Sequence, residues 1–113
     1  MVTWWATTVE CASGLARLER DGALDRRGMA QALERLRLAA SGWAEVPATP
    51  PVREQAIRLV RNHPLRAADA IQLAAAIVAS DFQPSALEFV TLDGRQAAAA
   101  DREGFRVLPE APA

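Results

Sequence analysis

The sequence predicts an α/β fold in which a mainly parallel sheet is flanked by helices, giving a three-layer sandwich. Short apolar segments alternate along the chain with longer segments of helical periodicity, and this alternation is typical of parallel sheets. The 113 residues, 50% of them hydrophobic, suit one domain with an ordinary core. We assign residues 1–109 to this domain and residues 110–113 to a loose C-terminal tail.

The first part of the chain predicts a strand followed by two helices. Residues 2–6 are short, apolar and rich in tryptophan, as expected of a buried strand. The next helix runs to Asp21-Gly22, and its first residues, Thr7-Thr8-Val9-Glu10, match a capping box. A second helix begins near Asp25, a good N-cap, and ends at about Trp43. The short link between the two helices predicts an antiparallel hairpin.

The second part predicts three further helices and three short strands. Residues 44–46 suit a strand, and Pro50-Pro51 opens a helix that stops before His63-Pro64. Residues 66–80 are apolar nearly all round, which predicts a helix in the middle of the core. The remaining elements are the clearest strand over residues 87–92, a helix over 95–103 that Gly104 ends, and a last strand over 105–108.

The bulk composition excludes several classes of protein. The formal net charge is −1, so nucleic-acid binding would need a local site rather than a basic surface. Cys11 is the only cysteine, which excludes an internal disulfide and a cysteine zinc site. There is no secretory signal and no apolar stretch of the roughly 20 residues that span a bilayer. We therefore expect a cytoplasmic protein with no membrane partner.

Three carboxylates stand where predicted strands end or helices begin, and α/β sheets form their sites there. Glu10 lies in the first turn after the first strand, Asp69 in the first turn of the buried helix, and Asp93 directly after the clearest strand. Parallel strands would bring Glu10 and Asp93 to one edge, and Asp69 joins them if its helix starts beneath that edge. Hard oxygen ligands without nitrogen or sulfur favour Mg²⁺ or Mn²⁺ over zinc.

Each of these carboxylates also has a purely structural interpretation. Glu10 can complete the capping box and Asp93 can cap its helix, and taken singly both are better explained in this way. Asp69 can complement the helix dipole, but it interrupts an apolar helix, where an unpaired charge is costly. Function and structure explain Asp69 equally well. The single histidine, His63, precedes a proline and is better explained as a packing or capping residue than as a base.

Three segments, in register, resemble the PIN domain family. Residues 63–74, His-Pro-Leu-Arg-Ala-Ala-Asp-Ala-Ile-Gln-Leu-Ala, resemble the stretch around the third acidic position of that family. Residues 89–93 with Arg95, followed by Gly104-Phe105, resemble the closing strand, the fourth acidic position and the last helix. Thr7-Thr8-Val9-Glu10 fits the second acidic position. Together the segments cover nearly the whole chain in the family's order.

The resemblance implies a doubly wound parallel sheet and Mg²⁺-dependent cleavage of RNA, with Mn²⁺ as an alternative ion. By analogy, Glu10, Asp69 and Asp93 bind the metal directly or through water, and Thr91 assists by hydrogen bonding near the site. Most small bacterial members are VapC-like toxins of toxin–antitoxin pairs that form homodimers and are inhibited by a cognate antitoxin. The implied partners are therefore RNA, an antitoxin and a second copy, with the hairpin over residues 8–43 as the docking surface.

The chain departs from the family at its first residues. A complete PIN domain opens with a central strand that carries the first acidic residue, whereas Met1-Val2 leads directly into the family's second strand. The sequence is therefore expected to be N-terminally truncated, degenerate, or completed by a strand from another chain. A non-catalytic protein on the same scaffold, which binds an antitoxin or another partner, is the alternative function.

Overall fold

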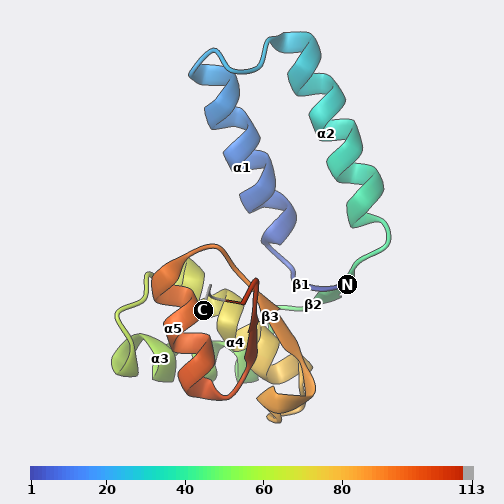
Figure 1. The fold of residues 1–113 in the computed structure, drawn as a ribbon. Helices are drawn as coiled ribbons and strands as arrows, with labels where there is room; N and C mark the ends of the chain where they lie inside the picture. Colours follow the sequence, from blue (N-terminus) through green and yellow to red (C-terminus); the bar gives the residue numbers. More distant parts are fainter. Residues whose placement is uncertain (111–113) are drawn as a thin grey trace. The chain divides into compact units, whose positions relative to one another are not determined.

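The computed structural model describes residues 1–110, and its elements follow the predicted order of an α/β protein (Figure 1). In chain order they are β1 (Val2–Trp4), α1 (Thr7–Arg20), α2 (Arg26–Ala40), β2 (Ala44–Val46), α3 (Pro50–Asn62), α4 (Ala67–Ala79), the 3₁₀ helix η1 (Pro84–Ala86), β3 (Glu88–Val90), α5 (Gly94–Glu103) and β4 (Arg106–Leu108). Most of the predicted tail, residues 111–113, lies outside the described residues. The chain divides into two compact units, Met1–Glu45 and Val46–Ala113.

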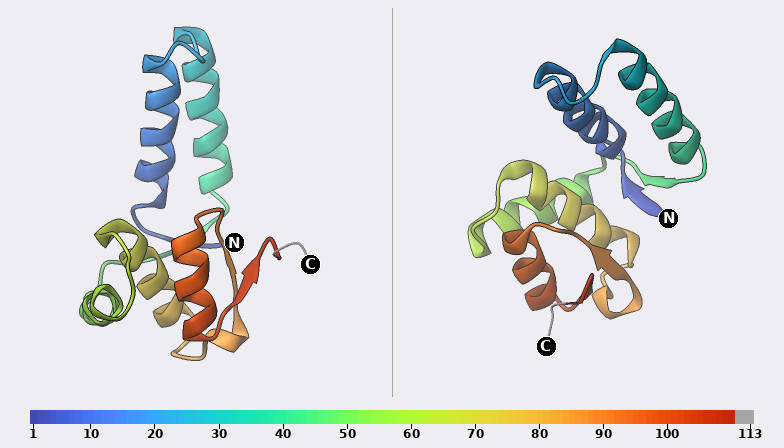
Figure 2. Two further views of the ribbon diagram at one scale, coloured as in Figure 1. Left: turned by 60° about the vertical axis from the view of Figure 1, so that its left-hand side comes forward. Right: turned by 45° about the horizontal axis from the view of Figure 1, so that its top comes forward.

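The first unit consists mainly of the predicted helical hairpin. Helices α1 and α2 lie side by side and antiparallel, as Figures 1 and 2 show. Gly22 in the link takes a φ of 82°, a conformation that glycine adopts without steric cost. The predicted N-cap of α2 is confirmed, because the side chain of Asp25 accepts a hydrogen bond of 2.7 Å from the backbone N–H of Gly28.

The capping box predicted at the start of α1 is wrong. Ala6 is the N-cap residue and makes no side-chain capping hydrogen bond, and Thr7 is already the first helical residue. A capping threonine needs an extended backbone, whereas Thr7 lies within the helix and even Ala6 before it has helical dihedral angles (φ −84°, ψ −2°). Glu10 therefore lies one position further along the helix than a capping box requires. Its backbone N–H donates to the carbonyl oxygen of Ala6 over 3.0 Å.

The core of the second unit is the packing of α3 against α4. The predicted central helix is confirmed in α4, whose buried residues are Ala70, Leu73, Ala74, Ala75 and Ile77. Leu59 of α3 and Leu73 of α4 are the largest fully buried side chains of the described residues. The small alanines bring the neighbouring backbones close together, so that these two leucines fill the space between the helices.

The strands form two short sheets, one of β1 and β2 and one of β3 and β4. Strands β3 and β4 are parallel, as predicted, with Phe89 opposite Val107 and Val90 opposite Leu108. Val90 remains 72% exposed, so the sheet is only partly covered.

Gly104 ends α5 in the left-handed conformation (φ 105°), which confirms its predicted role as the end of this helix. None of the helices within residues 1–110 has the length and hydropathy required to span a bilayer.

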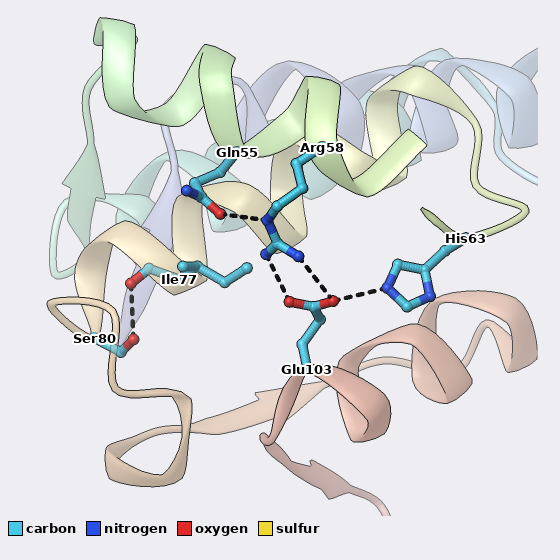
Figure 3. A network of polar contacts seen from close by, with 6 residues as sticks. All are labelled: Gln55, Arg58, His63, Ile77, Ser80 and Glu103. Atoms are coloured by element: carbon cyan, nitrogen blue, oxygen red, sulfur yellow. Dashed lines mark hydrogen bonds and ion pairs between the residues drawn. The ribbon is translucent and has the colours of Figure 1, made fainter. Parts of the chain in front are cut away.

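A half-buried carboxylate ties the end of α5 to α3 (Figure 3). The two oxygens of Glu103 accept hydrogen bonds of 2.6 and 3.2 Å from the guanidinium of Arg58, and Oε2 lies 2.8 Å from Nε2 of His63. Arg58 holds the pKa of Glu103 below its ordinary value, although burial opposes this shift and His63 adds to it. Because a carboxylate can only accept, Nε2 of His63 carries the proton. These contacts support the packing role of His63.

We predict that Glu103→Gln lowers the free energy of unfolding by about 1–2 kcal/mol at neutral pH, since it weakens charge-assisted bonds between α3 and α5. The lowered pKa of Glu103 means that this stabilisation is present above the ordinary carboxyl pKa of 4.5. It is lost as the pH falls below 4.5 through the lowered pKa. Urea unfolding of both proteins at about pH 7 and about pH 3.5 measures the difference, which should shrink in acid.

Glu34→Gln is the matched control for this prediction. It removes an ion pair with Arg37 in which both side chains are more than half exposed, so little change in stability is expected. An equal effect of the two substitutions, or a Glu103 effect that does not depend on pH, would contradict the prediction.

Candidate functional site

Two of the predicted site carboxylates lie at the starts of helices in the second unit. Asp69 is in the first turn of α4, and Asp93 is the N-cap residue of α5. The partial positive charge of each helix N-terminus favours a carboxylate at these positions. The helix-capping role expected of Asp93 is confirmed, because its Oδ1 accepts hydrogen bonds from the backbone N–H groups of Arg95 (2.9 Å) and Gln96 (3.0 Å). Both bonds end on Oδ1, so the cap makes no use of Oδ2, and Asp93 is an exposed residue.

A buried glutamine joins the turns that carry the two carboxylates. Gln96 is 4% exposed, although it lies in the first turn of α5. Its Nε2 donates to the backbone carbonyl of Asp69 over 3.2 Å and to Oε1 of Gln72 over 2.9 Å. Its Oε1 accepts a hydrogen bond of 2.7 Å from the hydroxyl of Thr91. The start of α4 and the start of α5 are therefore linked through one side chain.

Thr91 is fixed between the sheet and α5. Its backbone N–H donates to the carbonyl of Leu108 over 3.0 Å, which continues the pairing of β3 with β4. Its hydroxyl donates to Gln96 and accepts a hydrogen bond of 3.1 Å from the backbone N–H of Asp93. With its proton held by Gln96, the hydroxyl is suited to orienting the Asp93 turn. The assisting role predicted for Thr91 is compatible with this geometry and stays a prediction.

Asp69 is less buried than the apolar sequence around it predicted. It has intermediate exposure, and its neighbours Ala67 and Ala68 are exposed, so the buried part of α4 begins at Ala70. The first turn of α4 reaches the surface of the unit, and its carboxylate can therefore keep part of its hydration. Asp69 differs from an ordinary residue at a helix start because its backbone carbonyl accepts a hydrogen bond from Gln96, and not because its charge is buried.

The third predicted carboxylate belongs to the other unit. Glu10 lies in the first turn of α1 and has intermediate exposure. The structure thus brings together the turns of Asp69 and Asp93 within the second unit. The membership of Glu10 in the same site stays a prediction.

The oxygen donors of the second unit are of the type that a hard cation prefers. Asp69 and Asp93 supply two carboxylates, and Mg²⁺ is commonly held by one or two carboxylates together with water and substrate phosphate. Within residues 1–110 no group of three or more His, Cys, Asp or Glu side chains is gathered to hold a metal ion. The residues present therefore fit Mg²⁺ or Mn²⁺ by donor type and supply part of a coordination sphere.

Two residues of this network had no functional assignment from the sequence. Gln72 carries a weak signal, because it is a polar residue within the apolar run of α4. Gln96 carries none, since a glutamine in the first turn of a helix is ordinarily exposed. Gln96 lies 27 positions after Asp69 and 24 positions after Gln72, and bonds over such separations cannot be recognised from local sequence pattern.

We predict that Asp93→Asn and Asp93→Ala differ in stability. Asparagine keeps an oxygen that can cap α5, so its effect should be small, whereas alanine should lower the free energy of unfolding by about 1 kcal/mol. Urea unfolding of both variants measures the difference. Asp25→Asn and Asp25→Ala, which alter the corresponding cap of α2, are the controls and should show the same order. Equal destabilisation by Asn and Ala at position 93 would argue against the cap.

Comparison with known proteins identifies the family to which the chain belongs. The model of the PIN domain matches residues 2–102, which include both carboxylate turns, the α1–α2 hairpin and most of α5. No curated protein and no solved structure matches the chain. PIN domains form a nuclease superfamily whose members generally depend on divalent metal ions. Because the match extends over most of its length, the chain belongs to the PIN domain family.

Proposed function

We propose that this protein is a divalent-metal-dependent ribonuclease of the PIN type and the toxin of a toxin–antitoxin pair, acting in the cytoplasm. The observation that carries the proposal is the network in which Gln96 bonds to the Asp69 turn and to the Asp93 turn. This network links the starts of α4 and α5, each of which carries one of the two carboxylates. Phosphodiester hydrolysis by a metal ion needs such an oxygen-rich, electrostatically polarised site.

The proposed roles follow from the chemistry of each group. Asp69 and Asp93 hold Mg²⁺ or Mn²⁺, Glu10 is the third proposed ligand, and Thr91 orients the Asp93 turn. When bound, the ion activates water and offsets the negative charge of the phosphodiester. The starts of α4 and α5 also carry the exposed residues Arg66 and Arg95. Their charges and the helix N-termini favour an RNA phosphate locally, in a protein whose net charge is −1.

The proposed protein partners are a cognate antitoxin and a second copy of the chain. Neither α1 nor α2 contains a buried residue. Apolar side chains remain exposed on both helices, including Val9 at 65% and Leu38 at 58%. Exposed apolar side chains on a helical hairpin are typical of surfaces that another protein covers. This exposure supports the hairpin as the docking surface for the antitoxin and for homodimer formation.

A second candidate function is a non-catalytic PIN protein that binds an antitoxin or another partner. It is favoured by the absence, within residues 1–110, of a gathered group of three metal-binding side chains. Fewer ligands lower metal affinity, while the protein-binding surface is unaffected. Calorimetric titration with Mg²⁺ and Mn²⁺ helps to separate the two functions, because tight binding that depends on Asp69 and Asp93 would count against the non-catalytic one.

We predict that the purified chain cleaves RNA in Mg²⁺ or Mn²⁺ and that EDTA abolishes the cleavage. Asp69→Asn and Asp93→Asn should each reduce the rate by about 100-fold or more, because each removes charge from the metal-binding oxygens. Gel analysis of a labelled RNA measures the rates. Both variants should remain folded, which circular dichroism checks.

Asp101→Asn is the matched control, since Asp101 is an exposed carboxylate on the same helix as the Asp93 cap. Its cleavage rate should equal that of the unmodified protein. Cleavage that persists in both site variants would refute the site assignment, and a folded chain that neither binds metal nor cleaves RNA would favour the non-catalytic function.

We predict that Val9→Arg and Leu38→Arg weaken homodimer formation and antitoxin binding by about tenfold or more, since each puts a charge into an apolar interface. Analytical ultracentrifugation measures the dimer, and titration calorimetry measures antitoxin binding. Ile57→Arg is the control, because Ile57 is 55% exposed on α3 in the other unit. The same loss in the control, or no loss in the hairpin variants, would count against the hairpin as the interface.

A further inference from the structure

The amide of Gln96 is held in one orientation by its neighbours. The backbone carbonyl of Asp69 can only accept a hydrogen bond, so the Nε2 side of the amide must face it. The Oε1 side consequently faces Thr91, whose hydroxyl must donate its single proton there. The lone pairs of that hydroxyl are then available to the backbone N–H of Asp93, as observed at 3.1 Å.

A continuous chain of hydrogen bonds therefore connects the two carboxylate turns. It runs from the Asp69 carbonyl through the Gln96 amide and the Thr91 hydroxyl to the Asp93 N–H. A second link is direct, because the backbone N–H of Gln96 donates to Oδ1 of Asp93. Gln96 is thus linked to Asp93 at two points, directly to the carboxylate and through Thr91 to the backbone N–H. An apolar side chain at position 96 could fill the space but could not form the link through Thr91.

A simple structural explanation accounts for the burial of Gln96 but not for its choice of partners. A buried amide needs hydrogen bonds, and any neighbouring backbone groups could supply them. Here both N–H groups and the carbonyl oxygen of the amide are used, and their partners are the backbone of Asp69, the side chain of Gln72 one helical turn later, and Thr91 two residues before Asp93. Hydrogen bonds to groups around metal ligands commonly set the affinity of the site.

We propose that Gln96 is a positioning residue that fixes the Asp69 and Asp93 turns relative to each other for binding a divalent cation, an inference that rests on the proposed function. Gln96 touches neither the cation nor the RNA. It acts through the two aspartates, and its side chain lowers the freedom of the α4 and α5 starts before the cation arrives. The proposal assigns a metal-affinity role to a residue that is not itself a ligand.

The test compares Gln96→Met with the unmodified full chain. Methionine has a similar length and keeps the packing but removes all three side-chain hydrogen bonds. Mn²⁺ binding, measured by electron paramagnetic resonance, should weaken by about tenfold. In metal-free protein, NMR should show faster hydrogen exchange at the Asp93 amide, whose acceptor Thr91 is no longer oriented.

Ser80→Ala is the matched control for loss of a buried polar contact. Ser80 is buried at the opposite end of α4, where its hydroxyl donates to the carbonyl of Ile77 over 2.8 Å (Figure 3). This variant can lower the melting temperature but should change neither Mn²⁺ affinity nor exchange at Asp93. Thr91→Val provides a second variant should Gln96→Met not fold, since it breaks the same chain of bonds one link later and should weaken Mn²⁺ binding in the same way.

The outcomes separate this proposal from the proposed function. Mn²⁺ affinity that is unchanged in Gln96→Met but lost in Asp69→Asn and Asp93→Asn would overturn the positioning role and leave the metal site standing. If the unmodified chain does not bind Mn²⁺, both the proposed metal site and the role of Gln96 in metal binding would be overturned. Faster exchange at Asp93 in that case would show that Gln96 orders the turn for a structural reason alone.

Discussion

The position of α5 is the constraint on which the second unit depends, and polar contacts fix it at both ends. At its start, Gln96 bonds to the first turn of α4, and at its end, Glu103 bonds to Arg58 of α3 and lies against His63. Between these points, Ala99 and Ala100 are buried. Small apolar side chains bring helices together without selecting one register, whereas directional hydrogen bonds select it. The Asp93 cap is held at one end of this fixed helix.

The same groups serve stability and the candidate site. Oδ1 of Asp93 accepts two hydrogen bonds at the start of α5, and the cap makes no use of Oδ2. A carboxylate that caps a helix has lost much of its rotational freedom, which would lower the entropy cost of the metal coordination proposed for Asp93. The two interpretations of Asp93 that the sequence left open are therefore compatible, because they concern different oxygens of one carboxylate.

Local pattern predicted those parts of the fold whose causes are local. The cap at Asp25, the helix end at Gly104 and the central apolar helix follow from a few neighbouring residues each, and all three are confirmed. The capping box failed because a threonine caps a helix only when its own backbone is extended, and Thr7 is already the first residue of α1. The exposure of the Asp69 turn and the burial of Gln96 depend on how α4 and α5 meet, which no local pattern encodes. The PIN family is the part of the functional prediction that comparison confirms.

The sheet contributes less to the site than an α/β fold leads one to expect. Strands β3 and β4 pair over three residues each, and Leu92, directly before Asp93, is 92% exposed. Such a short pair cannot by itself hold the loop that follows it, because few ladder hydrogen bonds oppose fraying at the strand end. Thr91 compensates by bonding to Leu108 through its backbone and to Gln96 through its hydroxyl. The Asp93 turn is therefore held by the hydroxyl of Thr91 and the first N–H groups of α5 in addition to the short strand that precedes it.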